Sequence, residues 1–143
     1  GVHIWVVNFK GNSVSKIDIH TNAVVETVSV GEKPRGAVFD GEHIWVTNSG
    51  ENTLSKVDIH TNGRVATVSV GESPRGVAFD GAHIWIVNSD DDSISKMDIY
   101  TNEVTKKIYV GKKPRGVAFD GTHLWVANSE DNSVTKILRG DLR

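Results

Sequence analysis

The sequence predicts an all-β fold in which one four-stranded unit is repeated along the chain, and three observations lead to this prediction. A tryptophan recurs every 40 residues, and an asparagine three residues later keeps the same step. The repeated segments are rich in β-branched and aromatic residues, as strands are. The tryptophans are Trp5, Trp45, Trp85 and Trp125, and the asparagines are Asn8, Asn48, Asn88 and Asn128. A fixed period of this length is typical of a solenoid or a propeller.

Each 40-residue unit has the pattern of four short strands. In the first unit, segment 3–8 is apolar on both faces, which is typical of a strand that is covered on both sides. Segments 13–19 and 23–30 alternate apolar and polar residues more cleanly, so we expect them to lie nearer to solvent. Segment 36–40 leads into Asp40-Gly41, a dipeptide suited to a type I′ hairpin turn before the next strand. Four antiparallel strands with short connections predict a β-propeller blade, with strands A to D numbered from the axis outward.

The chain holds about three and a half such blades in a single partial propeller domain, residues 1–143. The repeats span residues 1–40, 41–80 and 81–120, and a half repeat spans 121–143. The first unit begins without a strand A, and the last stops after its strand C. The predicted order of strands is therefore BCD, ABCD, ABCD, ABC.

The second unit, HIWVTNSGENTLSKVDIHTNGRVATVSVGESPRGVAFDG, resembles the YVTN family of β-propeller repeats. In that family a Tyr-Val-x-Asn strand is followed by Ser-x-x-Asn-Thr, a Val-Ile-Asp strand, Thr-Asn, a Val-rich strand and Gly-x-x-Pro-x-Gly. The resemblance spans essentially the whole chain. Trp45, where the family often has tyrosine, is similar to the related streptogramin-lyase-like propellers. The resemblance implies a propeller fold and a secreted or periplasmic location, and it leaves the ligand open because such folds serve many functions.

A ring of this length does not close on itself, because propellers need roughly four to eight blades. Each terminal blade would expose one apolar flank, which favours association. We therefore expect a homodimer in which the last blade of one chain meets the first blade of the other. The number of blades in the dimer ring depends on how the terminal strands are used. If one spare hairpin per chain is discarded, the ring has about six blades, whereas the total number of strands suits about seven. If every strand is kept, the ring has about eight blades, which is the number we favour. The alternative is that the chain is a fragment of a longer propeller or an engineered protein.

The composition excludes several classes of partner. The 16 basic and 18 acidic residues give a net charge of -2, so nucleic acid and anionic membranes are not expected as partners. The sequence has no cysteine, which excludes disulfides and thiolate metal sites. No apolar run approaches the ~20 residues that span a bilayer. No cofactor is predicted.

The best candidate binding site lies at one mouth of the central channel. Arg35, Arg75 and Arg115 precede strand A in successive units, where the D–A and B–C connections are expected to meet. Guanidinium groups arranged in this way can hold a carboxylate or a phosphate. Acidic residues of the B–C loops are predicted at the same mouth; they are Glu51, Asp91 and Asp131. A competing interpretation is that each arginine forms an ion pair with one of these loop acids.

Periodic histidines are expected at the opposite end, in the A–B and C–D turns. They are His3, His20, His43, His60, His83 and His123. The third unit has Tyr100 where a second histidine would be needed, so we interpret them as packing residues of the turns rather than as metal ligands. The tryptophans are interpreted as packing residues between blades rather than as sugar-binding platforms. No catalytic residue is predicted.

The sequence therefore favours a non-enzymatic interaction scaffold. Catalysis needs unlike groups at one point, whereas a repeat supplies the same group in every blade. Such a scaffold would present its arginine-lined face to a protein, a peptide or a small anion. An alternative function is that of a streptogramin-lyase-like, metal-assisted lyase. A further alternative is a propeller fragment or an engineered chain without a ligand.

Overall fold

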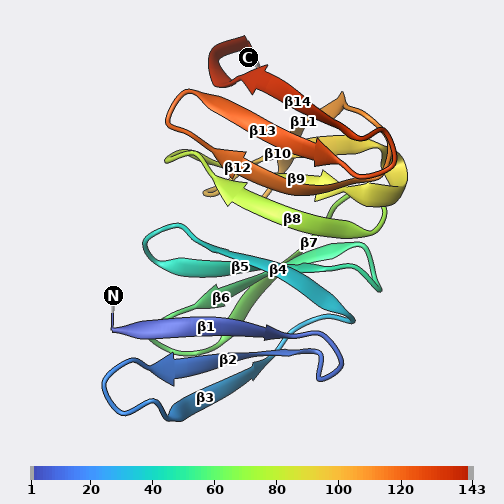
Figure 1. Ribbon diagram of the computed structural model, residues 1–143. Coiled ribbons are helices and arrows are strands. Elements are labelled where there is room, and N and C mark those ends of the chain that lie inside the picture. Colours follow the sequence, from blue (N-terminus) through green and yellow to red (C-terminus); the bar gives the residue numbers. More distant parts are fainter. Residues whose placement is uncertain (1, 142–143) are drawn as a thin grey trace.

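The computed structural model describes residues 2–141, which form fourteen strands and two short 3₁₀ helices (Figure 1). The first blade contains β1 (His3–Asn8), β2 (Ser13–Asp18) and β3 (Val24–Ser29). The second contains β4 (Pro34–Phe39), β5 (His43–Asn48), β6 (Thr53–Asp58) and β7 (Arg64–Ser69). The third contains β8 (Pro74–Phe79), β9 (His83–Asn88), η1 (Ser89–Asp91), β10 (Ser93–Asp98) and β11 (Val104–Tyr109). The fourth contains β12 (Pro114–Phe119), β13 (His123–Asn128), β14 (Ser133–Leu138) and η2 (Arg139–Asp141).

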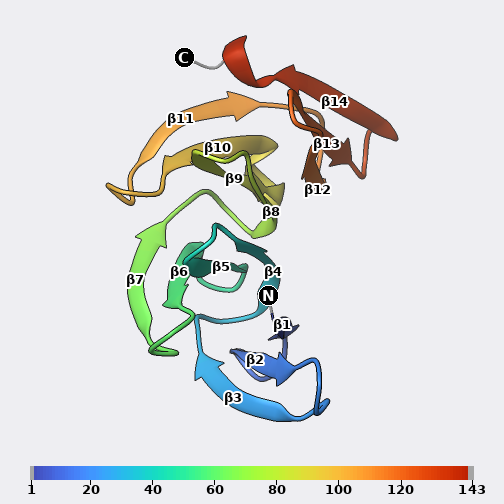
Figure 2. The ribbon, with the colours of Figure 1, turned by 90° about the vertical axis from the view of Figure 1, so that its left-hand side faces the viewer.

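Each blade is one antiparallel sheet whose strands pair in chain order. The two middle sheets have four strands and the two terminal sheets have three. Figure 2 shows the sheets fanning around an axis, with β4, β8 and β12 on the inner side and β3, β7 and β11 on the outer side. The predicted partial β-propeller of about 3.5 blades is thereby confirmed. Within residues 2–141, the first sheet has no inner strand beside β1, and the last has no outer strand beside β14.

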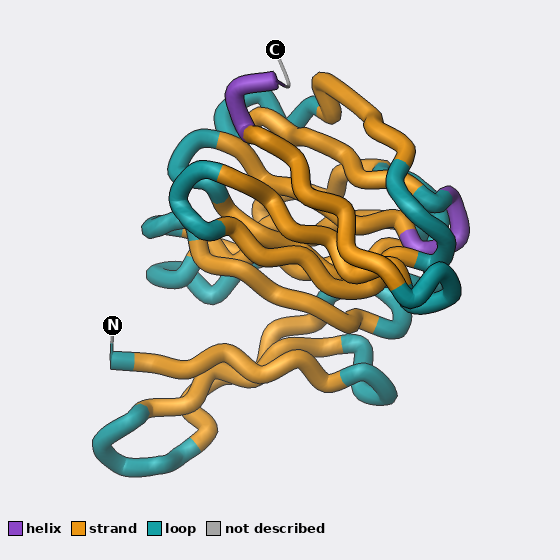
Figure 3. Tube along the Cα trace, turned by 45° about the horizontal axis from the view of Figure 1, so that its top comes forward, coloured by secondary structure: helices purple, strands orange, loops and turns teal. Residues whose placement is uncertain are grey.

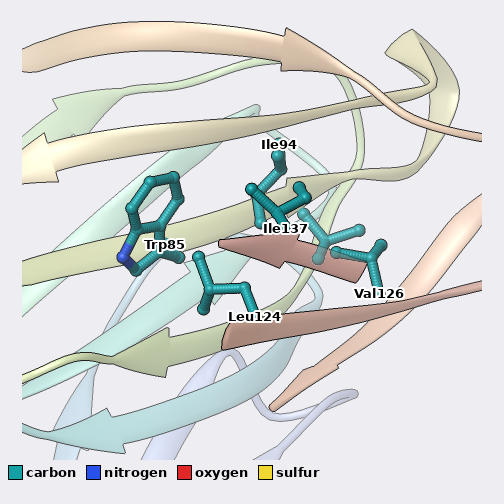
Figure 4. Close-up of a cluster of buried hydrophobic side chains, with 6 residues drawn as sticks. Trp85, Ile94, Leu124, Val126 and Ile137 are labelled. Carbon is teal, nitrogen blue, oxygen red and sulfur yellow. The ribbon is translucent and has the colours of Figure 1, made fainter. Parts of the chain in front are cut away.

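The core lies between blades, because each sheet packs its apolar faces against its neighbours. Figure 4 shows the cluster between the third and fourth blades, where Trp85 and Ile94 meet Leu124, Val126 and Ile137. All five side chains are buried. Two further clusters of the same kind join the first blade to the second and the second to the third. Strand B of the middle blades is therefore covered on both faces, as its sequence predicts.

The A–B turns differ from the predicted type I′ turn. Gly41, at the first central position, has a φ of +106°, whereas Glu42 at the second does not have a positive φ. Type I′ needs positive φ at both central positions, so this turn is not of type I′. The Asp40 side chain accepts hydrogen bonds from the amides of Glu42 at 2.8 Å and His43 at 2.7 Å. These two bonds fix the turn through the aspartate side chain.

A buried asparagine joins the connections at the other end of each middle blade. In the second blade, the Asn48 side chain accepts a hydrogen bond from the Gly31 amide at 3.1 Å. It also donates to Thr53 Oγ1 at 3.1 Å and to Ser55 Oγ at 2.8 Å. The B–C loop and the D–A connection are thus held together at one end of the sheet. Figure 3 shows the loops gathered at the ends of the strands. Over residues 2–141, we find no helix that is long and apolar enough to cross a membrane.

Candidate functional site

The first blade presents an apolar face that no other sheet of residues 2–141 covers. Ile4, Val6 and Ile19 are 56%, 40% and 42% exposed. Their counterparts 40 residues later include Ile44 and Val46, which are buried against the first blade. We call Ile4, Val6 and Ile19 the first-blade face. The same side chains that pack one blade against the next are therefore open to solvent here.

The fourth blade presents the complementary apolar face. Trp125 is 38% exposed and Val134 is 61% exposed, and Ala127 is also exposed. The equivalent residues of the third blade, Trp85 and Ile94, are fully buried against the fourth. We call Trp125, Ala127 and Val134 the last-blade face. The two open faces are the two halves of the interface that occurs three times inside the chain.

A lysine crosses each of the first two blade junctions. Lys16 Nζ donates to the Ile59 carbonyl at 2.8 Å and to Asn62 Oδ1 at 3.1 Å in the following blade. The next lysine, Lys56, repeats both bonds, to Ile99 and Asn102. Each lysine also lies over the tryptophan of its own blade. These bonds join the blades through charge-assisted contacts in a partly buried setting.

The last lysine of the series and the first acceptor pair lie at the two open faces. Lys136 Nζ lies 5.0 Å from the centre of the Trp125 ring and makes no hydrogen bond within residues 2–141. The carbonyl of Ile19 and the side chain of Asn22 occupy the acceptor positions in the first blade. Sequence reasoning missed this contact. The sequence signal for this contact is that the lysines and the turn asparagines both recur every 40 residues.

The predicted arginines lie at equivalent places on the three inner strands, at the end that carries the B–C loops (Figure 1). Arg35 Nε donates to Ser49 Oγ at 3.0 Å, and the guanidinium carbon lies 4.5 Å from the centre of the Phe9 ring. Arg75 is half-buried, and its Nε is buried without a hydrogen-bond partner among the described residues. Burial lowers the pKa of Arg75, and the positive charges of Arg35 and Arg115 lower it further. The positive charges of Arg35 and Arg115 therefore both act on Arg75.

The predicted acidic residues lie in the B–C loops, where they bind other partners. Glu51 Oε1 accepts a hydrogen bond from Thr53 Oγ1 at 2.8 Å. Asp91 Oδ2 accepts from the Glu72 amide at 3.1 Å and from Lys107 Nζ at 3.0 Å. Asp131 Oδ2 accepts from the Lys112 amide at 2.8 Å. These carboxylates shape the D–A connections, and within the described residues none of them forms an ion pair with the three arginines.

At the opposite end, an aspartate binds the tryptophan of each of the last three blades. The indole nitrogen of Trp85 donates to Asp80 Oδ2 at 2.8 Å, and Trp45 and Trp125 do the same with the aspartates five residues earlier. The imidazole of His83 lies 3.7 Å from the same Asp80 oxygen. Over residues 2–141, we find no group of three histidine or acidic side chains placed to hold a metal ion.

A cleft of about 590 Å³ lies between the first two blades, beside β1. Its lining includes Trp5, Lys16, Val38, Phe39 and Ile44. In the other blades, the corresponding edge of strand B is paired with an inner strand. The cleft is therefore part of a blade junction that the three-stranded first sheet leaves open.

Comparison with solved structures supports the propeller fold. The chain aligns with hydrazine synthase from Kuenenia stuttgartiensis over 96% of its own length and 46% of that chain, with a TM-score of 0.81 and 23% identity. The alignment with streptogramin B lyase covers 95% of this chain and 51% of that chain, with a TM-score of 0.74 and 16% identity. The alignment with the computationally designed Ika4 protein covers 96% of this chain and 86% of that chain, with a TM-score of 0.83 and 13% identity. The chain thus spans about half the length of the first two of these proteins. No protein-family model and no curated protein matches the sequence.

Proposed function

We propose that the protein is a non-enzymatic scaffold in which two copies join end to end into a closed β-propeller. The observation that carries this proposal is the match between the two open faces and the three internal blade junctions. The last-blade face of one copy would cover the first-blade face of the other. A two-fold axis along the channel makes the two contacts identical and closes the ring.

Burial of the faces supplies the driving force. Complete burial of one valine, leucine, isoleucine or phenylalanine side chain contributes about 1.5–3 kcal/mol relative to exposure. Ile4, Val6 and Ile19 from one copy and Val134 from the other are partly or mostly exposed in the single chain. Because the ring has two such contacts, each of these gains counts twice. The loss of translational and rotational freedom opposes association by about 4–15 kcal/mol, and it occurs only once per dimer.

The internal junctions also support a polar contact in the proposed assembly. Lys136 Nζ of one copy would donate to the Ile19 carbonyl and to Asn22 Oδ1 of the other. This contact repeats the geometry of Lys16 with Ile59 and Asn62. This contact would favour one register of the two faces. In any other register the lysine charge would be desolvated without a hydrogen-bond partner, which is unfavourable.

Two observations favour a ring of two copies that keeps all strands. Both terminal sheets are fully paired three-stranded sheets, so neither contains a spare hairpin to discard. The chain also spans about half the length of the two larger propellers that it resembles. Two copies would then form about eight blades, within the usual size of a propeller.

Light scattering on the purified protein at micromolar concentration tests the proposal. We expect a mass of twice the 15.6 kDa of the single chain. Val134→Glu should shift the protein to the single-chain mass, because it places a charge on the last-blade face. Val65→Glu, at a 54% exposed valine on the outer strand β7, is the matched control and should keep the double mass. A wild-type mass of one chain, or equal effects of the two substitutions, would overturn the proposal.

A further inference from the structure

We propose that Arg35, Arg75 and Arg115 form a binding site for a small oxyanion that carries carboxylate or phosphate oxygens. The site lies at the loop end of the inner strands β4, β8 and β12. All three residues belong to one chain, so the site does not depend on the proposed assembly. It adds a ligand to a protein whose proposed role is otherwise structural.

Close approach of the inner strands brings the three arginines together. A Cβ atom placed on Gly36 would lie 2.5 Å from the backbone oxygen of Arg75, and a Cβ on Gly76 would lie 2.5 Å from that of Arg115. Any side chain at these positions would therefore collide with the next inner strand. The glycine that follows each of the first two arginines lets consecutive strands pack at backbone distance. As a result, the backbones at successive arginine positions lie close together.

The central arginine has an unused donor. Arg75 Nε is buried and has no hydrogen-bond partner in the described part of the chain. Asp90 attracts Arg75, but its Oδ1 already accepts a 2.7 Å hydrogen bond from Lys113 Nζ. A buried donor without a partner costs about 1–3 kcal/mol, so an anion that accepts from Nε would remove this cost.

The flanking arginine on β4 is held in place before any ligand arrives. Arg35 is anchored by its bond to Ser49 Oγ and by the Phe9 ring beneath its guanidinium group. Within residues 2–141, Arg35 donates its side-chain hydrogen bond through Nε, which leaves the terminal nitrogens of the fork available to a ligand. A guanidinium fixed in this way loses less entropy when it binds, and its planar fork matches the oxygens of a carboxylate or a phosphate.

The acidic neighbours offset the positive charge of Arg75 only in part, because the attraction of Asp90 does not reverse the lowering of its pKa. Among residues 2–141, no carboxylate forms an ion pair with Arg35, Arg75 or Arg115. Burial of Arg75 and repulsion from the other two arginines both lower the pKa of Arg75. A bound anion would relieve this repulsion. The unused Nε donor of Arg75 and the positive charge around it therefore both favour an anionic ligand.

Isothermal titration with inorganic phosphate and, separately, with citrate tests the site at constant ionic strength. We expect saturable binding of at least one of the two anions, and the tighter one identifies the phosphate or the carboxylate class. Arg75→Gln should weaken this binding about tenfold or more, as loss of a charged hydrogen bond does. Arg75→Lys should weaken it as well, because lysine lacks the planar fork. Arg64→Gln removes an exposed arginine on β7 and is the matched control.

Two further variants test the site even if Arg75→Gln unfolds the chain. Arg35→Gln and Arg115→Gln replace exposed side chains, and each should weaken binding severalfold while the circular dichroism spectrum is unchanged. Absence of saturable binding to both anions by the wild type would overturn the proposal. Equal weakening by Arg64→Gln and the site variants would also overturn it, because it would indicate binding to net charge alone. Anion binding by a chain that stays monomeric would support the site and contradict only the proposed assembly.

Discussion

Lys56 reaches across a blade junction to Ile99, where its Nζ donates to the backbone carbonyl at 3.1 Å. The same nitrogen donates to Asn102 Oδ1 at 3.2 Å and lies 4.7 Å from the centre of the Trp45 ring. One side chain therefore bridges its own blade and the next. Because the lysine recurs every 40 residues, the contact can be compared between an internal junction and an open face.

Lys56→Met and Lys136→Met should behave differently although they are the same change in equivalent positions. Lys56→Met leaves two partly buried oxygens without their donor, and we expect it to lower the free energy of unfolding by about 1–3 kcal/mol. Lys136→Met removes no hydrogen bond within the described chain. It should leave the stability of the single chain nearly unchanged and weaken association. Urea unfolding at low protein concentration and light scattering at high concentration measure the two effects.

Equal losses of single-chain stability in these two variants would contradict the assignment of Lys136 to an intermolecular contact. Val65→Glu gives the baseline for an exposed change on an outer strand.

Gly76→Ala should destabilise the fold, whereas Gly116→Ala should not. The new Cβ at position 76 would lie 2.5 Å from the Arg115 backbone oxygen, while at position 116 it would meet nothing within 4 Å. Relief of such a clash requires backbone movement, which typically costs about 1–3 kcal/mol. Thermal unfolding should show a clear decrease for Gly76→Ala only. Similar midpoints for both variants would mean that Gly76 does not lie against the Arg115 backbone.

Stability should decrease in acid through the aspartates that bind tryptophan. Burial raises the pKa of Asp80, but hydrogen bonds from Trp85 and from the amides of Ala82 and His83 outweigh it and leave the pKa below its usual value. A carboxyl group whose pKa is lowered by folding contributes its full stabilisation above the unfolded pKa, about 3.9. That contribution is lost as the pH falls from there towards the folded pKa. We therefore expect urea midpoints to be steady near neutral pH and to fall below about pH 4.

Asp80→Asn tests which group is responsible. The variant should be less stable than the wild type at pH 7, and the difference should narrow at pH 3 because the wild-type carboxylate is then being protonated. Glu42→Gln removes the same charge from an exposed position and should follow the wild-type pH profile. A difference between Asp80→Asn and wild type that is the same at both pH values would contradict this role of Asp80.

The sequence predicted most of the fold because the 40-residue step carries both strand pattern and turn chemistry. The order BCD, ABCD, ABCD, ABC corresponds to the fourteen strands of the structure. The turn at Gly41 was predicted wrongly as type I′, because a dipeptide indicates where positive φ is allowed and not how the Asp40 side chain will bind the following amides. Turn location was therefore easier to predict than turn type.

Contacts between blades were harder to predict than contacts within one blade. The partners of Lys16 lie 43 and 46 residues away, and their meeting depends on the rotation between sheets. The buried Nε of Arg75 likewise depends on how closely the inner strands approach. The arginine positions were visible in the sequence, but the unused donor was not.

Zero-length carbodiimide cross-linking of the Asn22→Asp variant tests the central claim most directly. Aspartate tolerates the positive φ of position 22, and the internal junctions place the lysine nitrogen 3.1 to 3.2 Å from the corresponding side-chain oxygen. In an equal mixture of ¹⁵N-labelled and unlabelled chains, we predict cross-linked peptides that join Lys136 of one copy to Asp at position 22 of another. Cross-links that join only like ends of two copies, or an absence of any link between copies at micromolar concentration, would contradict the account.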